Sequence, residues 1–148
     1  LILTYGYKAI TSFLDTKTVV ESASFREDLR LGVESIKNTL SVRKLDLRIP
    51  GSHSKICFAR KCKKNNETND LDGCYNSVPE LEYNNSVMYN AWKTDTQNVF
   101  LWPMIETPIY FKEIDVADTN GWFCAPIISG RVLLKLEGKG NRAVISQW

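Results

Sequence analysis

Apolar residues early in the chain follow the period of a helix. They recur at intervals of three and four, at Phe25, Leu29, Val33, Ile36 and Leu40. This spacing places them on one face of a helix, and Ser24 followed three residues later by Glu27 is typical of a capping box at a helix start. We therefore predict an amphipathic helix that begins at Ser24 and ends at about residue 40 or 41.

After residue 41 the apolar period changes to two, which is typical of half-buried strands. Leu45, Leu47 and Ile49 alternate with charged residues, and Ile56 and Phe58 alternate again beyond the turn Pro50-Gly51-Ser52. Residues 59–86 are polar and predict a long loop. Further strands are predicted at residues 87–92, 98–102, 109–116 and 121–125. The clearest pair, 131–137 and 142–148, flanks Gly138-Lys139-Gly140-Asn141, a four-residue hairpin connection.

These patterns predict an α+β fold in two parts. Residues 1–41 form an N-terminal region with an apolar start and an amphipathic helix, and residues 42–148 form a β-rich domain of six to eight strands. The strands are expected to be mostly antiparallel because their connections are short. We expect a sandwich-like domain with the helix packed on one face.

The first ten residues are apolar and then change character, since Tyr5, Tyr7 and Lys8 follow the apolar start. This order is typical of the headgroup end of a membrane helix. The run is shorter than the ~20 residues that span a bilayer, and it lacks the charged start and cleavage pattern of a signal peptide. Two interpretations stay open: the end of a longer apolar helix that contacts a membrane or other subunits, or a buried first element of the domain. The contact residues would be Leu1, Ile2, Leu3, Tyr5, Tyr7, Ile10, Phe13 and Leu14.

Four cysteines indicate disulfide bonds. They are Cys57, Cys62, Cys74 and Cys124, and no two of them form a C-x-x-C pair. Because the chain also has only one histidine, this spacing fits a zinc site poorly. Of the three possible pairings we favour Cys62–Cys74, which closes the polar loop, and Cys57–Cys124, which joins an early strand to a late one. Such bonds predict an oxidising, extracellular compartment.

Two sequons agree with that location. Asn66-Glu67-Thr68 and Asn84-Asn85-Ser86 are acceptors for N-glycosylation, and both lie in the polar stretch. We predict glycans at Asn66 and Asn84.

The sequence lacks the motifs of common enzyme classes, which favours a protein that is not an enzyme. No nucleotide-binding, hydrolase or metalloprotease motif is present, and His53 is predicted to lie in an exposed turn. Residues 68–73 resemble a calcium loop but lack its first Asp, so we expect no metal and no cofactor. A net charge of +2 does not favour nucleic acid as a partner.

The four tryptophans are expected to serve mainly as core residues. Three of them are assigned to the core, because Trp commonly fills sheet interiors. Trp148 is the one most expected to be exposed or to touch a neighbouring molecule.

Several segments resemble archaeal type IV pilin-like and membrane-anchored surface proteins. Residues 3–10 resemble the end of an anchor helix, and Leu45-Asp46-Leu47-Arg48-Ile49-Pro50 is followed by Ile56-Cys57-Phe58. Further segments of this kind are Asn98-Val99-Phe100-Leu101, Trp122-Phe123-Cys124 and Leu134-Lys135-Leu136-Glu137-Gly138-Lys139-Gly140. In that family an apolar N-terminal helix packs in a filament core or holds the protein in the membrane, and the β domain faces outward. No processing site is visible here, and residues 1–10 lack the glutamate usual near the start of a mature pilin helix.

The function expected from these features is that of a non-enzymatic cell-surface structural protein. It would be a pilin-like filament subunit or a membrane-anchored display or adhesion module, with self-association or membrane contact through the N-terminal helix and a possible glycan or protein receptor. The alternative is a secreted receptor- or glycan-binding module, such as a viral glycoprotein fragment. Its site would be the 59–86 loop and exposed Trp or Tyr residues.

Overall fold

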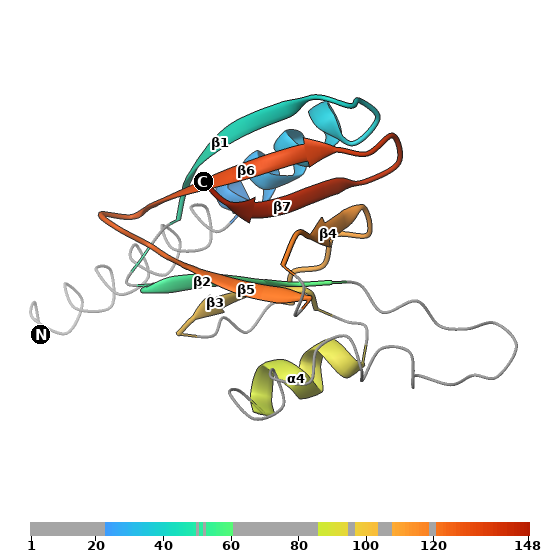
Figure 1. Cartoon of the computed structure of the whole chain (residues 1–148). Helices are drawn as coiled ribbons and strands as arrows, with labels where there is room; N and C mark the ends of the chain where they lie inside the picture. Colours follow the sequence, from blue (N-terminus) through green and yellow to red (C-terminus); the bar gives the residue numbers. More distant parts are fainter. Residues whose placement is uncertain are drawn as a thin grey trace, which may run out of the picture.

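The computed structural model describes residues 23–49, 51, 53–60, 86–94, 97–103, 108–118 and 121–148. Residues 23–36 are helical. The elements that follow are β1 (Val42–Arg48), β2 (Lys55–Ala59), α4 (Ser86–Lys93), β3 (Val99–Trp102), β4 (Ile114–Val116), β5 (Trp122–Pro126), β6 (Arg131–Gly138) and β7 (Ala143–Gln147). Figure 1 shows two sheets, with the helix 23–36 beside the β1–β6–β7 sheet and α4 below the other. The predicted α+β, sandwich-like architecture is thereby confirmed in outline.

The described strands form one sheet of four and one of three. The strand order is β1-β6-β7-β4 in the first sheet and β3-β2-β5 in the second. Each neighbouring pair is antiparallel except β4 and β7, as the short connections predicted. The β6–β7 hairpin is confirmed as well, and the Lys139 N–H donates to the Arg142 carbonyl across its connection at 3.0 Å.

The main core lies between the two sheets and the helix 23–36. The predicted apolar face of the helix is confirmed at Phe25, Leu29, Val33 and Ile36, none of them more than 2% exposed. The first sheet contributes Leu47, Val132, Leu134, Leu136 and Ile145 to the core. The second sheet contributes Ile56, Phe58, Val99, Leu101 and Ala125. Burying this apolar surface is the main favourable term in folding.

The helix differs from the prediction at both ends. Ala23 and Ser24 are already helical, so Ser24 is not the N-cap that its sequence pattern predicted. Glu27 accepts two hydrogen bonds from Arg30, at 2.6 and 2.8 Å, and these lower the pKa of the Glu27 carboxyl. At the other end the helix stops at Ile36, and Leu40 is 85% exposed. The inclusion of Leu40 in the apolar face was therefore wrong.

The early helix end is fixed by the approach of β6. A Cβ atom at Gly138 would collide with the carbonyl oxygens of Ile36 and Thr39, so only glycine allows this contact. The Thr39 hydroxyl donates to the Ile36 carbonyl at 2.8 Å, and the Gly138 N–H donates to the Ser41 carbonyl at 2.9 Å. The first bond satisfies a carbonyl group that the helix end leaves without an intrahelical partner. The second continues the pairing of β1 with β6 and directs the chain into β1.

Strand β2 is buried on both faces, whereas the alternation of Ile56 and Phe58 predicted a half-buried strand. Ile56 and Phe58 face the main core, while Cys57 and Ala59 face the opposite way and are at most 1% exposed. The second face is covered by α4, which packs Tyr89 and Trp92 against it. An alternating pattern cannot be told from a fully buried strand when both sets of side chains are apolar.

The segment 87–92 is helical, so the predicted strand there was wrong. Tyr89 and Trp92 are both buried and lie three residues apart, a spacing that places them on one helix face. The Trp92 indole N–H donates to the carbonyl oxygen of Arg60 at 2.7 Å. Val87 is the one β-branched residue in the segment, so the strand prediction depended on aromatic residues, which pack as well on a helix.

A polar bridge joins the second sheet to the first. Arg60, directly after β2, donates from Nε to the Asp115 carboxylate at 2.8 Å, and Arg142 approaches the other oxygen at 3.2 Å. Asp115 lies in β4, which is shorter than the predicted strand 109–116, while Ile109 forms a separate bridge to Val99. One carboxylate therefore holds the end of β2, β4 and the β6–β7 connection together.

Leucine-to-alanine substitutions test where the helix ends. Leu29→Ala should lower the free energy of unfolding by about 2–5 kcal/mol, because it leaves a cavity in a packed core. Leu40→Ala makes the same chemical change at an exposed site and should alter stability by less than about 0.5 kcal/mol. Urea denaturation of both variants checks this. Equal losses would show that the helix continues to Leu40.

Candidate functional site

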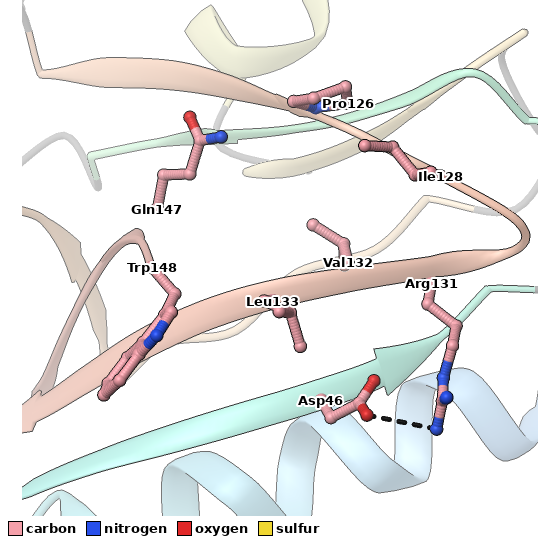
Figure 2. A pocket seen from close by; sticks show the side chains of 8 residues that line it. All are labelled: Asp46, Pro126, Ile128, Arg131, Val132, Leu133, Gln147 and Trp148. Atoms are coloured by element: carbon pink, nitrogen blue, oxygen red, sulfur yellow. Dashed lines mark ion pairs between the residues drawn. The ribbon is translucent and has the colours of Figure 1, made fainter.

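A hollow of about 430 Å³ opens where the chain passes from the second sheet to the first. It is lined by Asp46, Pro126, Ile128, Arg131, Val132, Leu133, Gln147 and Trp148, and we call it the Trp148 hollow. Figure 2 shows Trp148 and Gln147 on one side, the Asp46–Arg131 ion pair on another, and Pro126 with Ile128 on the strand that leads into the turn. Three segments far apart in the sequence thus meet at one surface.

A two-residue turn builds one wall of the hollow. Ile128 and Arg131 exchange backbone hydrogen bonds at 2.9 and 3.0 Å. Between them Ser129 and Gly130 have φ values of 52° and 70°, the left-handed conformations of a type I′ turn. The turn leaves Ile128 71% exposed next to the first residues of β6.

The opposite wall carries two exposed apolar side chains. The alternation of β6 buries Val132 and Leu134 and leaves Leu133 40% exposed. The Trp148 N–H donates to the Leu133 carbonyl at 3.2 Å, which continues the β6–β7 pairing and places Trp148, 57% exposed, beside Leu133. Exposed apolar side chains that gather at one place mark contact surfaces.

Charged groups surround this apolar patch. Asp46 and Arg131 form an ion pair at 3.1 Å across β1 and β6, and the Lys44 ammonium lies 5.0 Å from the centroid of the Trp148 ring. Both members of the ion pair are about half exposed, so the pair adds little to stability. Farther along β6, Lys139 hydrogen-bonds the Glu137 carboxylate and lowers its pKa.

These groups suit reversible binding. An indole ring can stack on the apolar face of a ligand ring, while a carboxylate, a guanidinium and the Gln147 amide can hydrogen-bond polar groups around it.

Within the described ranges, no three His, Cys, Asp or Glu residues lie close enough to hold a metal ion. His53 is half-buried, and its Nδ1 has no hydrogen-bond partner among the described residues, whereas the sequence predicts an exposed turn residue.

The predicted Cys57–Cys124 disulfide is confirmed. The two sulfur atoms are 2.00 Å apart, and the residues are direct partners on the antiparallel strands β2 and β5. The bond lies on the face that α4 covers, in contact with Tyr89, Trp92 and Phe100. Because disulfides persist in oxidising compartments, it favours an extracellular environment.

The other predicted site residues lie outside the described residues and stay predictions. They are Cys62 and Cys74, the glycosylation sites Asn66 and Asn84, and the contact residues Leu1, Ile2, Leu3, Tyr5, Tyr7, Ile10, Phe13 and Leu14. In the part of the chain that the structure describes, no helix is long and apolar enough to cross a membrane.

The tryptophans divide between core and surface. Trp92 is buried and Trp122 is half-buried, as predicted for core residues, and Trp148 is exposed, also as predicted. Trp102 differs from the prediction. It is 40% exposed, with the Lys55 ammonium 5.6 Å from its ring, because it ends the edge strand β3.

Comparison with models of protein families, with curated proteins and with solved structures finds no match for this chain. The resemblance to pilin-like surface proteins therefore stays a prediction from the sequence.

Sequence reasoning missed most of the Trp148 hollow. The sequence singles out Trp148, but it assigns Asp46, Arg131 and Leu133 only to strands and gives no element for Ile128. One signal was present: Val132-Leu133-Leu134 interrupts the alternation of β6 and so places an apolar side chain on the outer face. Which residues of β1 and of the turn meet that side chain depends on the sheet order, which local patterns do not contain.

Removing the confirmed disulfide should be costly. The double variant Cys57→Ala/Cys124→Ala should lower the free energy of unfolding by about 4 kcal/mol, because the bond closes a loop across 67 residues of sequence. The matched variant Cys62→Ala/Cys74→Ala should lose about 3 kcal/mol if the predicted shorter loop forms. Urea denaturation, together with peptide mass mapping without reduction, measures both. A loss below about 1 kcal/mol for the first variant would contradict the assigned role of Cys57–Cys124.

Proposed function

We propose that this chain is a non-enzymatic protein of the cell surface, a pilin-like structural or display module with the β-rich body facing outward. The observation that carries the proposal is the disulfide buried between the β2–β5 pair and α4. A bond in that position is part of the folded body, which favours folding in a compartment where thiols are oxidised.

The layout of the chain supports the same role. A helix leads directly into a β-rich domain, and its apolar face is consumed by the main core. The main apolar face of this helix is therefore part of the body. Contacts with other subunits or with a membrane are assigned to the apolar residues 1–14, and glycans on Asn66 and Asn84 belong on the outward side.

A second function is favoured by the Trp148 hollow: binding of a glycan in an adhesive or receptor-binding module. The hollow has the size of a small-ligand site and combines an exposed indole ring with the Asp46, Arg131 and Gln147 polar groups. Rings that stack on sugars need one free face, and Trp148 is the most exposed of the described tryptophans. The two functions are compatible, because the hollow lies on the body and assembly is assigned to the N-terminal residues.

Assembly through the N-terminal residues is tested by sizing the full chain in buffer without detergent. The unaltered chain should form oligomers, and Leu3→Asp/Ile10→Asp should shift it toward smaller species, because buried charge opposes packing of an apolar helix. Leu40→Asp places the same charge on an exposed leucine of the body and should leave the size distribution unchanged. Light scattering after size exclusion provides the measurement. An unaltered chain that is monomeric at all concentrations would rule out the filament role.

Glycan binding is tested with an array of neutral and uronic-acid-containing oligosaccharides, followed by fluorescence titration of those retained. Trp148→Ala should weaken binding at least about tenfold, since aromatic anchors dominate such contacts. Trp102→Ala removes the other exposed tryptophan, which lies outside the hollow, and should leave binding unchanged. Retention of no oligosaccharide, or equal effects of the two variants, would exclude the hollow as a glycan site.

A further inference from the structure

Strand β1 is the longest open sheet edge in the described part of the chain. It is the outermost strand of its sheet and pairs only with β6. Its seven residues exceed those of the other edge strands, β3, β4 and β5, which have four, three and five. Short edges and prolines protect sheets from pairing with other chains, and β1 contains no proline.

The free edge consists of the backbone groups of the even-numbered residues. The Ile49 N–H donates to Gly130 and the Ser41 carbonyl accepts from Gly138, so the odd-numbered residues exchange hydrogen bonds with β6. In an antiparallel ladder the intervening residues direct their N–H and C=O groups to the other side. The outward groups therefore belong to Val42, Lys44, Asp46 and Arg48.

The side chains of these even-numbered residues carry an unbalanced charge. Lys44 lies directly opposite Lys135 on β6, and Arg48 lies opposite Arg131, although like charges in such positions are unfavourable. Lys44 contacts the Trp148 ring and forms no ion pair with another described residue. Asp46 is bonded to Arg131 and keeps 43% of its side chain exposed, so it can accept a second cation from the free side.

We propose that β1 pairs antiparallel with β1 of a second copy of this chain, with Leu45 on the twofold axis. In this register the outward backbone groups of Lys44 and of Asp46 in the second copy exchange hydrogen bonds, and the symmetry repeats the pair. Each Lys44 ammonium then meets the Asp46 carboxylate of the second copy, and the like charge of Lys135 is offset. The result is one continuous sheet through both molecules.

Other registers are disfavoured by charge. A shift of two residues one way places Lys44 against Lys44, and the opposite shift places Asp46 against Asp46. A shift of one residue would bring the core face of one sheet against the outer face of the other. A register centred on Leu47 would also bring opposite charges together, Asp46 against Arg48, but it overlaps only residues 46–48 of β1. The register centred on Leu45 combines opposite charges with pairing along all seven residues of the strand.

The helix offers a second contact beside this edge. Ser35 accepts a hydrogen bond from Arg43 of β1 at 2.9 Å, so this side of the helix faces the open edge. Leu31, four residues earlier and on the same side, is 51% exposed. In the paired sheet the helices of the two copies run side by side, and Leu31 gives them an apolar contact.

This pairing goes beyond the proposed function, because it needs no residue before the described helix and no membrane. It predicts a two-chain unit that exists whether or not residues 1–14 assemble. The two kinds of contact therefore have separate readouts.

A zero-length carbodiimide cross-link tests the register in the full chain. An equal mixture of ¹⁵N-labelled and unlabelled protein is treated with the reagent, digested and analysed by mass spectrometry. We expect a peptide pair of mixed isotope composition that joins the Lys44 amine to the Asp46 carboxylate. Cross-links of mixed composition that avoid these residues would overturn the pairing, as would their complete absence.

Charge exchange tests the energetics. Lys44→Asp alone and Asp46→Lys alone should each weaken two-chain association at least about tenfold in sedimentation equilibrium, because two attractive pairs become repulsive. The double variant Lys44→Asp/Asp46→Lys restores opposite charges and should return the dissociation constant to within about threefold, with the cross-link regained. Lys112→Asp makes the same change of charge at an exposed lysine just before β4 and away from β1, and should not weaken association.

Each outcome separates this pairing from assembly by the N-terminal residues. Association that is lost with Leu3→Asp/Ile10→Asp but insensitive to all charge variants would overturn the β1 pairing and leave the proposed function intact. A two-chain unit that follows the charge exchange and survives Leu3→Asp/Ile10→Asp would support the pairing, while the filament role is decided by whether larger oligomers are lost in that variant. Circular dichroism of each variant confirms that the monomer remains folded.

Discussion

The fold depends on the burial of β2 from both sides. Its Ile56 and Phe58 side chains complete the core between the two sheets, while Cys57 and Ala59 need a separate cover, which Tyr89 and Trp92 of α4 provide. A strand in that position cannot be exposed on either face without opening one of two apolar clusters. The hydrogen bond from Trp92 to the Arg60 carbonyl holds α4 in place, and the disulfide joins β2 to β5 beneath it. The remainder of the second sheet follows from this arrangement, since β3 and β5 are positioned by pairing with β2.

The joint between the helix and the first sheet is governed by close approach. Gly138 lets β6 pass against the carbonyl groups at the helix end, and the chain enters β1 at the point where β6 has finished. The absence of a side chain at Gly138 therefore determines how closely β6 packs on the helix end. The Arg60–Asp115–Arg142 bridge performs a related task with charge and ties the two sheets together near the same end of β6.

The sequence predicted the parts of the fold that depend on local periodicity. The buried face of the helix, the strands around Leu47, Phe58, Val99 and Leu134, and the β6–β7 hairpin all follow from spacing and turn residues. Leu40 and the segment 87–92 were predicted wrongly, because tertiary contacts with Gly138 and with β2 decided the helix end and the type of the segment. Of the residues that line the Trp148 hollow, the sequence singles out Trp148 alone. The lining residues come from three segments, and which of these lie together depends on the strand order. The Cys57–Cys124 disulfide could be predicted because four cysteines allow only three pairings.

The position of the disulfide also decides how the domain would carry tension. If the chain is pulled from its two ends, the force reaches Cys57, crosses the sulfur atoms and continues from Cys124. The segment between them, which holds α4, β3 and β4, lies outside the path of the load. About 220–240 Å of extended chain is thereby withheld from stretching, so a single covalent bond limits the extension of a protein whose proposed place is at an exposed surface.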